Sequence, residues 1–321
     1  MKRLSLFITA LFFTWQLIAQ NELPRFELDR AAVCGGVQTI MNIKGKWKKQ
    51  PDDINNYPDK TFPRSQYNQV FSRTDKIAGL FQQWNAHPDG LEPRWYRSIR
   101  GEPVVKDAGV PYAFNTYYYF YFCNERYKKA ELTGETGTMS FIFINQFSWF
   151  FDPYKVMDKQ MEVEGGKVFR VGKRIGKCQS MDLFEIVSFG QHSHALVITR
   201  DSSSPYKPVT RKQYLYYMIE HWPVQKEIFE DELTKSSEEV LKKPASLPLY
   251  GKSKQIFDDD EKEGLILATV NLNYFKKELP RYVPQFMVLY WSWNKNAPGL
   301  NFKKEFEENF PVEKLKEIID K

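Results

Sequence analysis

His192 and His194 are the two side chains whose type and spacing best suit a metal site. Residues two apart on a strand point to the same face, so these imidazoles would lie close enough to share one ion. A zinc site needs a third protein ligand, and the sequence leaves its identity open. The candidates are His87, His221, Asp182 and Glu185. Because the same strand face continues with Leu196 and Ile198, we expect two histidines at the rim of a core and no bound metal.

The segment 172–178, Gly-Lys-Arg-Ile-Gly-Lys-Cys, resembles a phosphate-binding loop in its glycines and lysine. It is one residue too short for that motif, and Cys178 stands where a Ser or Thr hydroxyl would bind magnesium. We therefore expect a basic turn between two strands. Since no other segment indicates a nucleotide or an organic group, the sequence predicts no cofactor.

Three cysteines could serve covalent chemistry or a disulfide, and they are Cys34, Cys123 and Cys178. A cysteine nucleophile needs a nearby histidine, which the sequence does not establish. The chain also has no Gly-x-Ser-x-Gly elbow for a serine nucleophile. In an oxidising compartment we expect one disulfide and one remaining thiol, with all three pairings open. The alternative is three buried free thiols, because cysteine packs as a small apolar residue.

The aromatic run 117–122 is the best candidate for a binding surface. Alternation along a strand divides its side chains between two faces. One face carries Tyr117, Tyr119 and Tyr121, and the other carries Tyr118, Phe120 and Phe122. An open tyrosine face could stack on a flat ligand such as a sugar ring or a peptide, whereas two covered faces would make the whole run core. Further aromatic surface comes from Trp47, Trp95 and Tyr96. The expected ligand contacts are Tyr117, Tyr119, Tyr121 and Trp95.

The first twenty residues are typical of a secretory signal peptide. Lys2 and Arg3 form a basic start, a mostly apolar run covers 4–19, and the chain turns polar from Asn21. The run is shorter than the roughly 20 residues that span a bilayer. We therefore expect 1–20 to be a signal peptide and the mature chain to be periplasmic or extracellular, with no transmembrane span. An uncleaved anchor is the alternative.

The composition excludes several other classes of protein. The 321 residues include 46 Lys and Arg against 40 Asp and Glu, and 42% are hydrophobic. These values are not those of a disordered chain or a polytopic membrane protein. Loss of Lys2 and Arg3 would lower the net charge from +6 to +4. This small excess is spread along the chain, so the sequence predicts no nucleic-acid partner.

The elements that must position these residues are a mixture of strands and helices. Ile77, Leu80, Phe81 and Trp84 form one helical stripe, with Thr74 placed to cap the helix start. Aromatic and β-branched residues predict strands over 112–122, 139–151, 184–188, 194–200, 265–275 and 284–293. Hairpins and consecutive strands with helices between them indicate an α+β fold with a mainly antiparallel sheet and helices packed against it.

A β-hairpin is predicted around Gly165 and Gly166, because two glycines can both take the positive φ of a two-residue turn. Val163 on one arm, and Val168 or Phe169 on the other, are expected to face the core.

The second half of the chain contains clear helix signals. Thr210 and Gln213 fit a capping box. The apolar stripe of the following helix is Leu215, Met218, Ile219 and Trp222. Charged residues dominate 236–264, which we expect to be a mobile insert in a single domain over 21–321. Near the end of the chain, Phe302, Phe306 and Phe310 fall on one helical face.

Five short segments, spread over most of the mature chain, carry a family resemblance. They are 45–47 (GKW), 62–70 (FPRSQYNQV), 95–99 (WYRSI), 208–215 (PVTRKQYL) and 309–315 (NFPVEKL). In these segments the chain resembles a family of exported bacterial proteins of unknown function. The resemblance implies export and a single coherent fold, and it implies no activity, cofactor or site residue.

The sequence thus predicts an exported protein without catalytic activity that binds a small molecule, a glycan or a protein. A metal- or cysteine-dependent hydrolase and a structural component of an envelope assembly are the alternatives. Converging histidines and carboxylates in a cleft would favour the hydrolase, and an open apolar groove would favour binding. A flat exposed patch would favour assembly.

Overall fold

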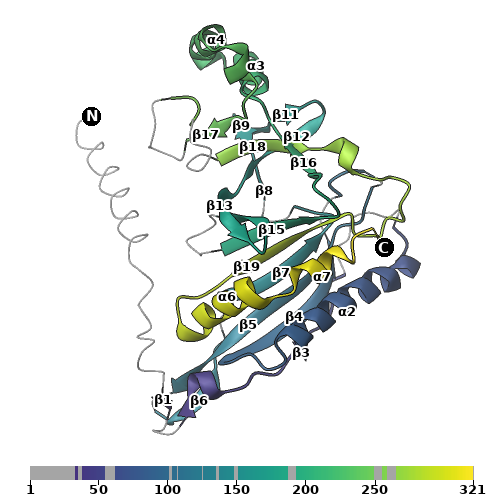
Figure 1. Cartoon of the computed structure of the whole chain (residues 1–321), viewed down its shortest axis with the longest axis vertical. Coiled ribbons are helices and arrows are strands. Elements are labelled where there is room, and N and C mark those ends of the chain that lie inside the picture. The colour runs from purple at the N-terminus through teal and green to yellow at the C-terminus, as the bar shows by residue number, and fades with distance from the viewer. Residues whose placement is uncertain are drawn as a thin grey trace, which may run out of the picture.

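The computed structural model describes residues 33–34, 38–54, 62–100, 103–106, 108–124, 126–134, 137–147, 151–186, 193–248, 255–258 and 265–320. Within these ranges a large and a small β-sheet pack on each other, and each carries helices on its other face (Figure 1). Three hydrophobic cores fill the spaces between these layers. The predicted α+β class with mainly antiparallel sheets is confirmed.

The large sheet has the strand order β13-β14-β15-β19-β7-β5-β4-β3, and β6 pairs with β5 beyond the end of β7. All of its described pairs are antiparallel apart from β3 with β4, which is parallel. Its strands are β3 (Lys48–Lys49), β4 (Leu91–Ile99), β5 (Tyr112–Asn124), β6 (Lys129–Leu132), β7 (Thr138–Ile144), β13 (Lys173–Cys178), β14 (Met181–Glu185), β15 (Ser193–Thr199) and β19 (Phe286–Ser292).

The small sheet has the order β11-β12-β18-β16, with β17 also paired to β18 and β8 to β12. Its strands are β8 (Phe151–Pro153), β11 (Glu162–Val163), β12 (Gly166–Val171), β16 (Tyr206–Pro208), β17 (Ser246–Leu247) and β18 (Leu265–Val270). Two isolated pairs complete the strands, and they join β1 (Val33–Cys34) to β2 (Gln38–Thr39) and β9 (Lys155–Val156) to β10 (Lys159–Gln160).

The helices form two groups on opposite sides of the paired sheets. One face of the large sheet carries α2 (Tyr67–Trp84), α6 (Ala297–Asn309) and α7 (Val312–Lys316). The small sheet carries α3 (Arg211–His221), α4 (Lys226–Lys235) and α5 (Glu238–Leu241). Short 3₁₀ turns are η2 (Ile40–Asn42), η3 (Arg64–Gln66), η4 (Pro223–Gln225) and η5 (Leu272–Tyr274).

The core between the large sheet and its helices is built on aromatic stripes. Phe302 and Phe306 of α6 and Phe310 just beyond it are all buried, as their helical spacing predicts. The ring of Phe81 on α2 lies 4.5 Å from that of Phe310 and 6.0 Å from that of Phe306. These contacts join the two helices to each other as well as to the sheet.

Arg97 links α2 to β4 by charge. Its side chain donates to Asp52 at 3.0 Å and to Asp75 of α2 at 3.0 and 3.1 Å. Its guanidinium also lies 4.0 Å from the ring centre of Phe71. Burial alone would raise the pKa of Asp52, but the hydrogen bonds and the charge of Arg97 outweigh burial and lower it. Arg97 is therefore committed to holding the helix against the sheet.

The capping box at the start of α3 is confirmed. The backbone N–H of Gln213 donates to the Thr210 hydroxyl at 3.2 Å, and the backbone N–H of Thr210 donates to the Gln213 side chain at 2.9 Å. Of the predicted stripe, Leu215 and Met218 are buried, while Trp222 ends the helix and is half-buried.

The predicted hairpin is present, but its turn lies one residue earlier than expected. Glu164 and Gly165 take the positive φ values, 51° and 76°, and Gly166 opens β12. A Cβ on Gly166 would stand 2.4 Å from the hydroxyl of Thr269 on β18, so this glycine is needed for close strand packing. Val163 and Val168 face the core as predicted, with 9% and 0% exposure.

The prediction that Thr74 caps its helix is wrong. Helix α2 begins at Tyr67, so Thr74 lies inside it and is buried. Its hydroxyl donates back to the carbonyls of Val70 at 3.2 Å and Phe71 at 3.0 Å. A threonine hydroxyl can be satisfied in this way within a helix as well as at its start, so the residue type alone does not fix the boundary.

The predicted strand 139–151 is two strands in different sheets. Strand β7 ends at Ile144, and β8 joins the small sheet at Phe151. Asn145 breaks the strand with a φ of 54°, and its amide donates to the Val283 carbonyl at 3.0 Å. The chain thus leaves the large sheet at Asn145, whose left-handed backbone conformation ends β7 and whose side-chain hydrogen bond holds it in place.

The predicted signal peptide lies outside the described residues. Of the insert 236–264, the structure describes 236–248 and 255–258, where Leu241, Ala245 and Phe257 are buried. No helix within the described ranges combines the length and apolar character that a membrane crossing requires.

Candidate functional site

Strand β5 carries the predicted aromatic run, and its two faces have different surroundings. Tyr118 is fully buried against the helix side, where its ring centre lies 4.5 Å from that of Phe302. Tyr117, Tyr119 and Tyr121 are partly exposed, as are Phe120 and Phe122 farther along the helix side. The three tyrosines therefore share the face of the large sheet that is turned away from α2 and α6.

Strands β3 and β4 add polar and aromatic side chains to this face. In the register of the sheet, Tyr119 lies opposite Glu92, and Tyr117 lies opposite Arg94. Arg94 in turn pairs with Lys48 of β3. Directly paired residues point to the same side of a sheet, and Tyr96 follows two residues after Arg94. We define the tyrosine face as Tyr96, Tyr117, Tyr119, Tyr121, Glu92, Arg94 and Lys48.

The tyrosine face continues the core between the two sheets. Ala113, at the start of β5, is buried in that core together with Ala268 and Val270 of the small sheet. Along the same side of β5, Asn115 is still buried and Tyr117 is the first residue with partial exposure. The cover provided by the small sheet thus ends between Asn115 and Tyr117.

Tyr96 and Tyr117 form the first part of the tyrosine face. Their rings are nearly parallel, with an interplanar angle of 7° and centroids 6.1 Å apart, and the edge of Tyr117 meets Phe141 at 5.2 Å. Burial raises the pKa of Tyr117, and a hydrogen bond with Tyr96 raises it further. The Tyr117 ring is therefore held between two aromatic neighbours, and its hydroxyl stays uncharged at neutral pH.

Glu92 organises the other half of the tyrosine face. Its carboxylate accepts from Lys48 at 2.7 Å and from Arg94 at 2.9 and 3.0 Å. The Arg94 guanidinium lies 4.4 Å from the ring centre of Tyr119, a cation–π contact. Burial raises the pKa of Tyr121, and the charge and hydrogen bond of Glu92 add to this effect. The Glu92 carboxylate thus interacts with the side chains of Lys48, Arg94 and Tyr121 and holds them in place.

Trp95 does not join the tyrosines. It lies on the opposite face of β4, is 7% exposed, and packs in the helix-side core with its ring 5.6 Å from that of Phe114. Alternation on β4 puts either Trp95 or Tyr96 with the tyrosines of β5, and the register selects Tyr96. Trp95, which we expected to contact the ligand, is therefore buried on the helix side, and Tyr96 is the aromatic residue of this pair that lies on the tyrosine face.

The weak metal candidates are placed as follows. His192 lies outside the described residues. His194 is 8% exposed, and its Nδ1 donates to the Glu307 carboxylate at 2.7 Å. Glu185 is its cross-strand partner, while His87 and His221 bond to the backbone carbonyls of Gly45 and Tyr217. Within the described ranges, no group of three or more His, Cys, Asp or Glu is arranged to hold a metal.

Cys178 has the surroundings of a structural thiol. It is 8% exposed, and its Sγ lies 3.4 Å from the backbone carbonyl of Glu307, to which it donates. Burial raises the pKa of the thiol, and the negative charge of Glu307 adds to the rise. A raised pKa leaves little of the nucleophilic thiolate at neutral pH, so this cysteine is poorly suited to attack a substrate.

The segment that resembles a phosphate loop is a strand, not the turn that we expected. Residues Lys173–Cys178 form β13 at the end of the large sheet, with a register shift between Arg174 and Gly176. A strand extends its backbone N–H groups to its neighbour, so they do not converge on a phosphate as those of a glycine-rich loop would.

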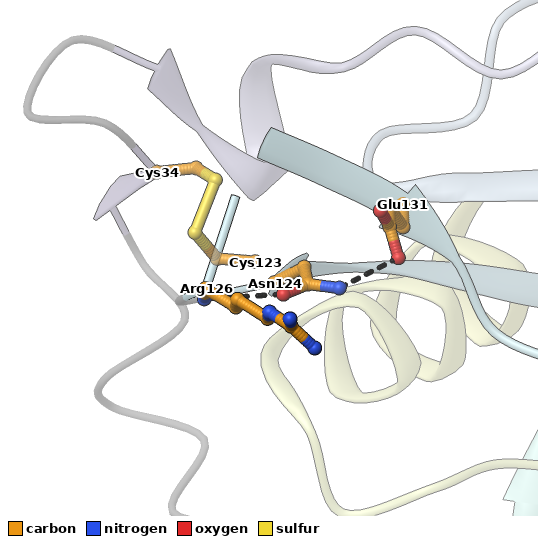
Figure 2. The surroundings of a disulfide bond; sticks show 5 residues. All are labelled: Cys34, Cys123, Asn124, Arg126 and Glu131. Carbon is orange, nitrogen blue, oxygen red and sulfur yellow. Dashed lines mark hydrogen bonds between the residues drawn. A yellow bond between two sulfur atoms is a disulfide. The ribbon is translucent and has the colours of Figure 1, made fainter. Parts of the chain in front are cut away.

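One disulfide joins Cys34 to Cys123, two residues beyond Tyr121 (Figure 2). Beside it, Asn124 donates to Glu131 of β6 at 3.0 Å and accepts from the backbone N–H of Arg126 at 3.1 Å. The predicted single disulfide with one remaining thiol is thus present, and the pairing left open by the sequence is Cys34 with Cys123.

A surface hollow of about 570 Å³ lies on the helix side of the sheet. Its lining is Asn68, Phe71, Ser72, Asp75, Lys76 and Arg97. Arg97 is already paired with the carboxylates of Asp52 and Asp75, so its guanidinium is engaged in holding the helix. The histidines and Cys178 considered above do not line this hollow.

The sequence reasoning missed Arg94, Glu92 and Lys48. The alternation of Glu92, Arg94 and Tyr96 within 91–99 was the available signal, since it places three polar or amphipathic residues on one strand face. Comparisons with known proteins do not identify the site, because no family model, curated protein or solved structure matches this chain.

Proposed function

We propose that this is an exported, non-catalytic binding protein whose ligand is a glycan chain lying on the tyrosine face. The observation that carries the proposal is the row of partly exposed tyrosines, which begins with the parallel rings of Tyr96 and Tyr117 and continues along β5. Sugar rings have flat C–H faces that stack on aromatic rings, while phenol hydroxyls can bond to sugar hydroxyls.

A glycan suits this surface better than a peptide does. Peptides commonly bind a sheet by adding a strand to a free edge. Strand β5 is paired on both sides, with β4 on one side and β7 and β6 on the other, so its backbone groups are engaged within the sheet. A ligand on this face must therefore be recognised by side chains. Those side chains are rings held in place by their neighbours, which lowers the entropy cost of binding.

Export is part of the same proposal and rests on two features. The basic start and apolar run of residues 1–20 are typical of a secretory signal. Disulfides persist in oxidising compartments, and this chain joins Cys34 to Cys123. The resemblance to exported bacterial proteins points in the same direction.

The test is a binding titration with neutral and acidic glycans, using cellohexaose, chitohexaose, polygalacturonate and alginate as probes. Tyr119→Ala should weaken binding about fivefold, because loss of one stacking contact corresponds to about 1 kcal/mol. Tyr216→Ala is the matched control, since Tyr216 is 54% exposed on α3, away from the tyrosine face. Absence of binding to every probe, or equal loss in both variants, would overturn the proposal.

A further inference from the structure

The charges of the tyrosine face are unequally exposed. The Glu92 side chain is 6% exposed, whereas those of Arg94 and Lys48 are 33% and 51% exposed. The negative charge therefore lies at the floor of the face, and two positive charges lie above it. With one carboxylate against two cations, this group also keeps a net positive charge.

Arg94 has unused hydrogen-bonding capacity. Its Nε and Nη2 bond to Glu92, and its guanidinium plane lies over Tyr119. Within the described part of the chain, Nη1 of Arg94 has no hydrogen-bond partner. Glu92 holds one edge of the guanidinium, and the Tyr119 ring covers one of its flat sides. The remaining N–H groups therefore point in a fixed direction, which suits recognition of a planar anion.

Arg94 also lies along the row of rings. It is the cross-strand partner of Tyr117 and contacts Tyr119, and the row continues to Tyr121. From Tyr117 to Tyr121 a strand rises by about 13 Å, at roughly 3.3 Å per residue. A chain that follows the tyrosines therefore passes over Arg94 and beside Lys48, which pairs with the same Glu92 carboxylate, so their charge bears on the choice of ligand.

Resting on the proposed function, we infer that the glycan is a uronate chain whose carboxylate pairs with Arg94 and Lys48. The sugar rings stack on the tyrosines, and the carboxylate accepts hydrogen bonds from the unused N–H groups of the two cations. A neutral glycan would stack on the same rings, but the free N–H groups of Arg94 and Lys48 would stay bonded to water. The tyrosine face thus binds sugar rings by stacking and prefers acidic over neutral glycans by charge.

The first test compares polygalacturonate with the same polymer after full methyl esterification, which removes the charge and keeps the sugar backbone. Calorimetric titration of the wild-type protein should give at least tenfold tighter binding of the acid form. This preference should shrink as salt rises from 50 to 500 mM, because exposed ion pairs are screened. Alginate and hyaluronan serve as second and third uronate chains.

The second test uses variants. Arg94→Gln should weaken binding of the uronate chain about tenfold and leave binding of the esterified polymer unchanged. Lys304→Gln is the matched control, since it removes one exposed positive charge from α6, on the other side of the sheet. A melting temperature close to that of the wild type in both variants shows that folding is intact.

The outcomes separate this inference from the proposed function. Equal affinity for the acid and ester forms, or binding of neutral glycans without any uronate chain, would overturn the charge selection and leave a glycan-binding tyrosine face. An acid preference that persists in Arg94→Gln would overturn the role of Arg94. Failure of every neutral and acidic probe would overturn both.

Discussion

Glu307, near the end of α6, accepts a hydrogen bond from Nδ1 of His194, on β15, at 2.7 Å. The same carboxylate accepts from Trp291 at 3.1 Å and from Lys303. Burial alone would raise the pKa of Glu307, but the hydrogen bonds from His194 and Lys303 outweigh burial and lower it. One ionised carboxylate therefore fastens α6 to the large sheet.

Glu307→Gln is expected to lower the free energy of unfolding at pH 7. It should also make the free energy of unfolding vary less with pH in the acid range. Since the folded pKa of Glu307 lies below the unfolded value of about 4.3, the unfolded state takes up the proton first. The stabilisation is present above that value and is lost as the pH falls through the folded pKa. Urea unfolding from pH 7 to pH 3 measures it. Stability curves of wild type and variant that run parallel would contradict the prediction.

Cys178 is expected to react slowly with thiol reagents in the folded protein. Burial and the neighbouring charge of Glu307 raise its pKa, so the thiolate is scarce at neutral pH. A colorimetric thiol assay should find almost no reactive thiol in the native protein and one per chain after unfolding without reductant. Rapid native labelling at Cys178 would reopen the question of a cysteine nucleophile.

Cys34→Ser is expected to lower the free energy of unfolding by about 2–5 kcal/mol, the range for loss of a native disulfide. The bond joins residues 89 apart in sequence, so it restricts a large part of the unfolded chain. Guanidinium unfolding measures the loss. As a control, dithiothreitol should destabilise the wild type and leave the variant unchanged. Equal midpoints for oxidised wild type and variant would rule out a stabilising bond.

Leu215→Ala and Trp222→Ala compare two positions of the stripe on α3. Leu215 is 0% exposed and should lose about 2–5 kcal/mol, the range for a buried leucine. The sequence alone suggests a still larger loss at Trp222, but this residue is half-buried at the helix end, so we expect about 1–2 kcal/mol. Denaturant unfolding of both variants decides the order. A larger loss at Trp222 would mean that the stripe is packed more tightly at its end than in its middle.

Features encoded by nearby residues were predictable from the sequence. The capping box of Thr210 and Gln213 depends on four consecutive residues, and the hairpin around Gly165 depends on about ten. The close contact between Gly166 and Thr269, about a hundred positions away, is not encoded in those ten residues. Local signals fix the element, and tertiary packing fixes its register.

The candidate site depended on long-range pairing, so it was predicted in part. Alternation separated Tyr117, Tyr119 and Tyr121 from Tyr118 correctly, because the period of a strand is a local property. The choice between Trp95 and Tyr96 required the register between β4 and β5, which no single strand encodes. The same register creates the contact between Arg94 and Tyr119, so the charged half of the face could not be assembled from the sequence alone.

Strand β13 has a consequence for how copies of this protein meet. Of the strands that the structure describes, it is the last on its side of the large sheet, and its backbone could template another chain. Its side chains include Lys173, Arg174 and Lys177, and the register shift at Gly176 bends it out of line. Like charge on two such edges, together with the bulge that twists each strand, disfavours pairing of two copies through β13. A filament that grows by adding the β13 of one copy to that of the next is therefore not expected.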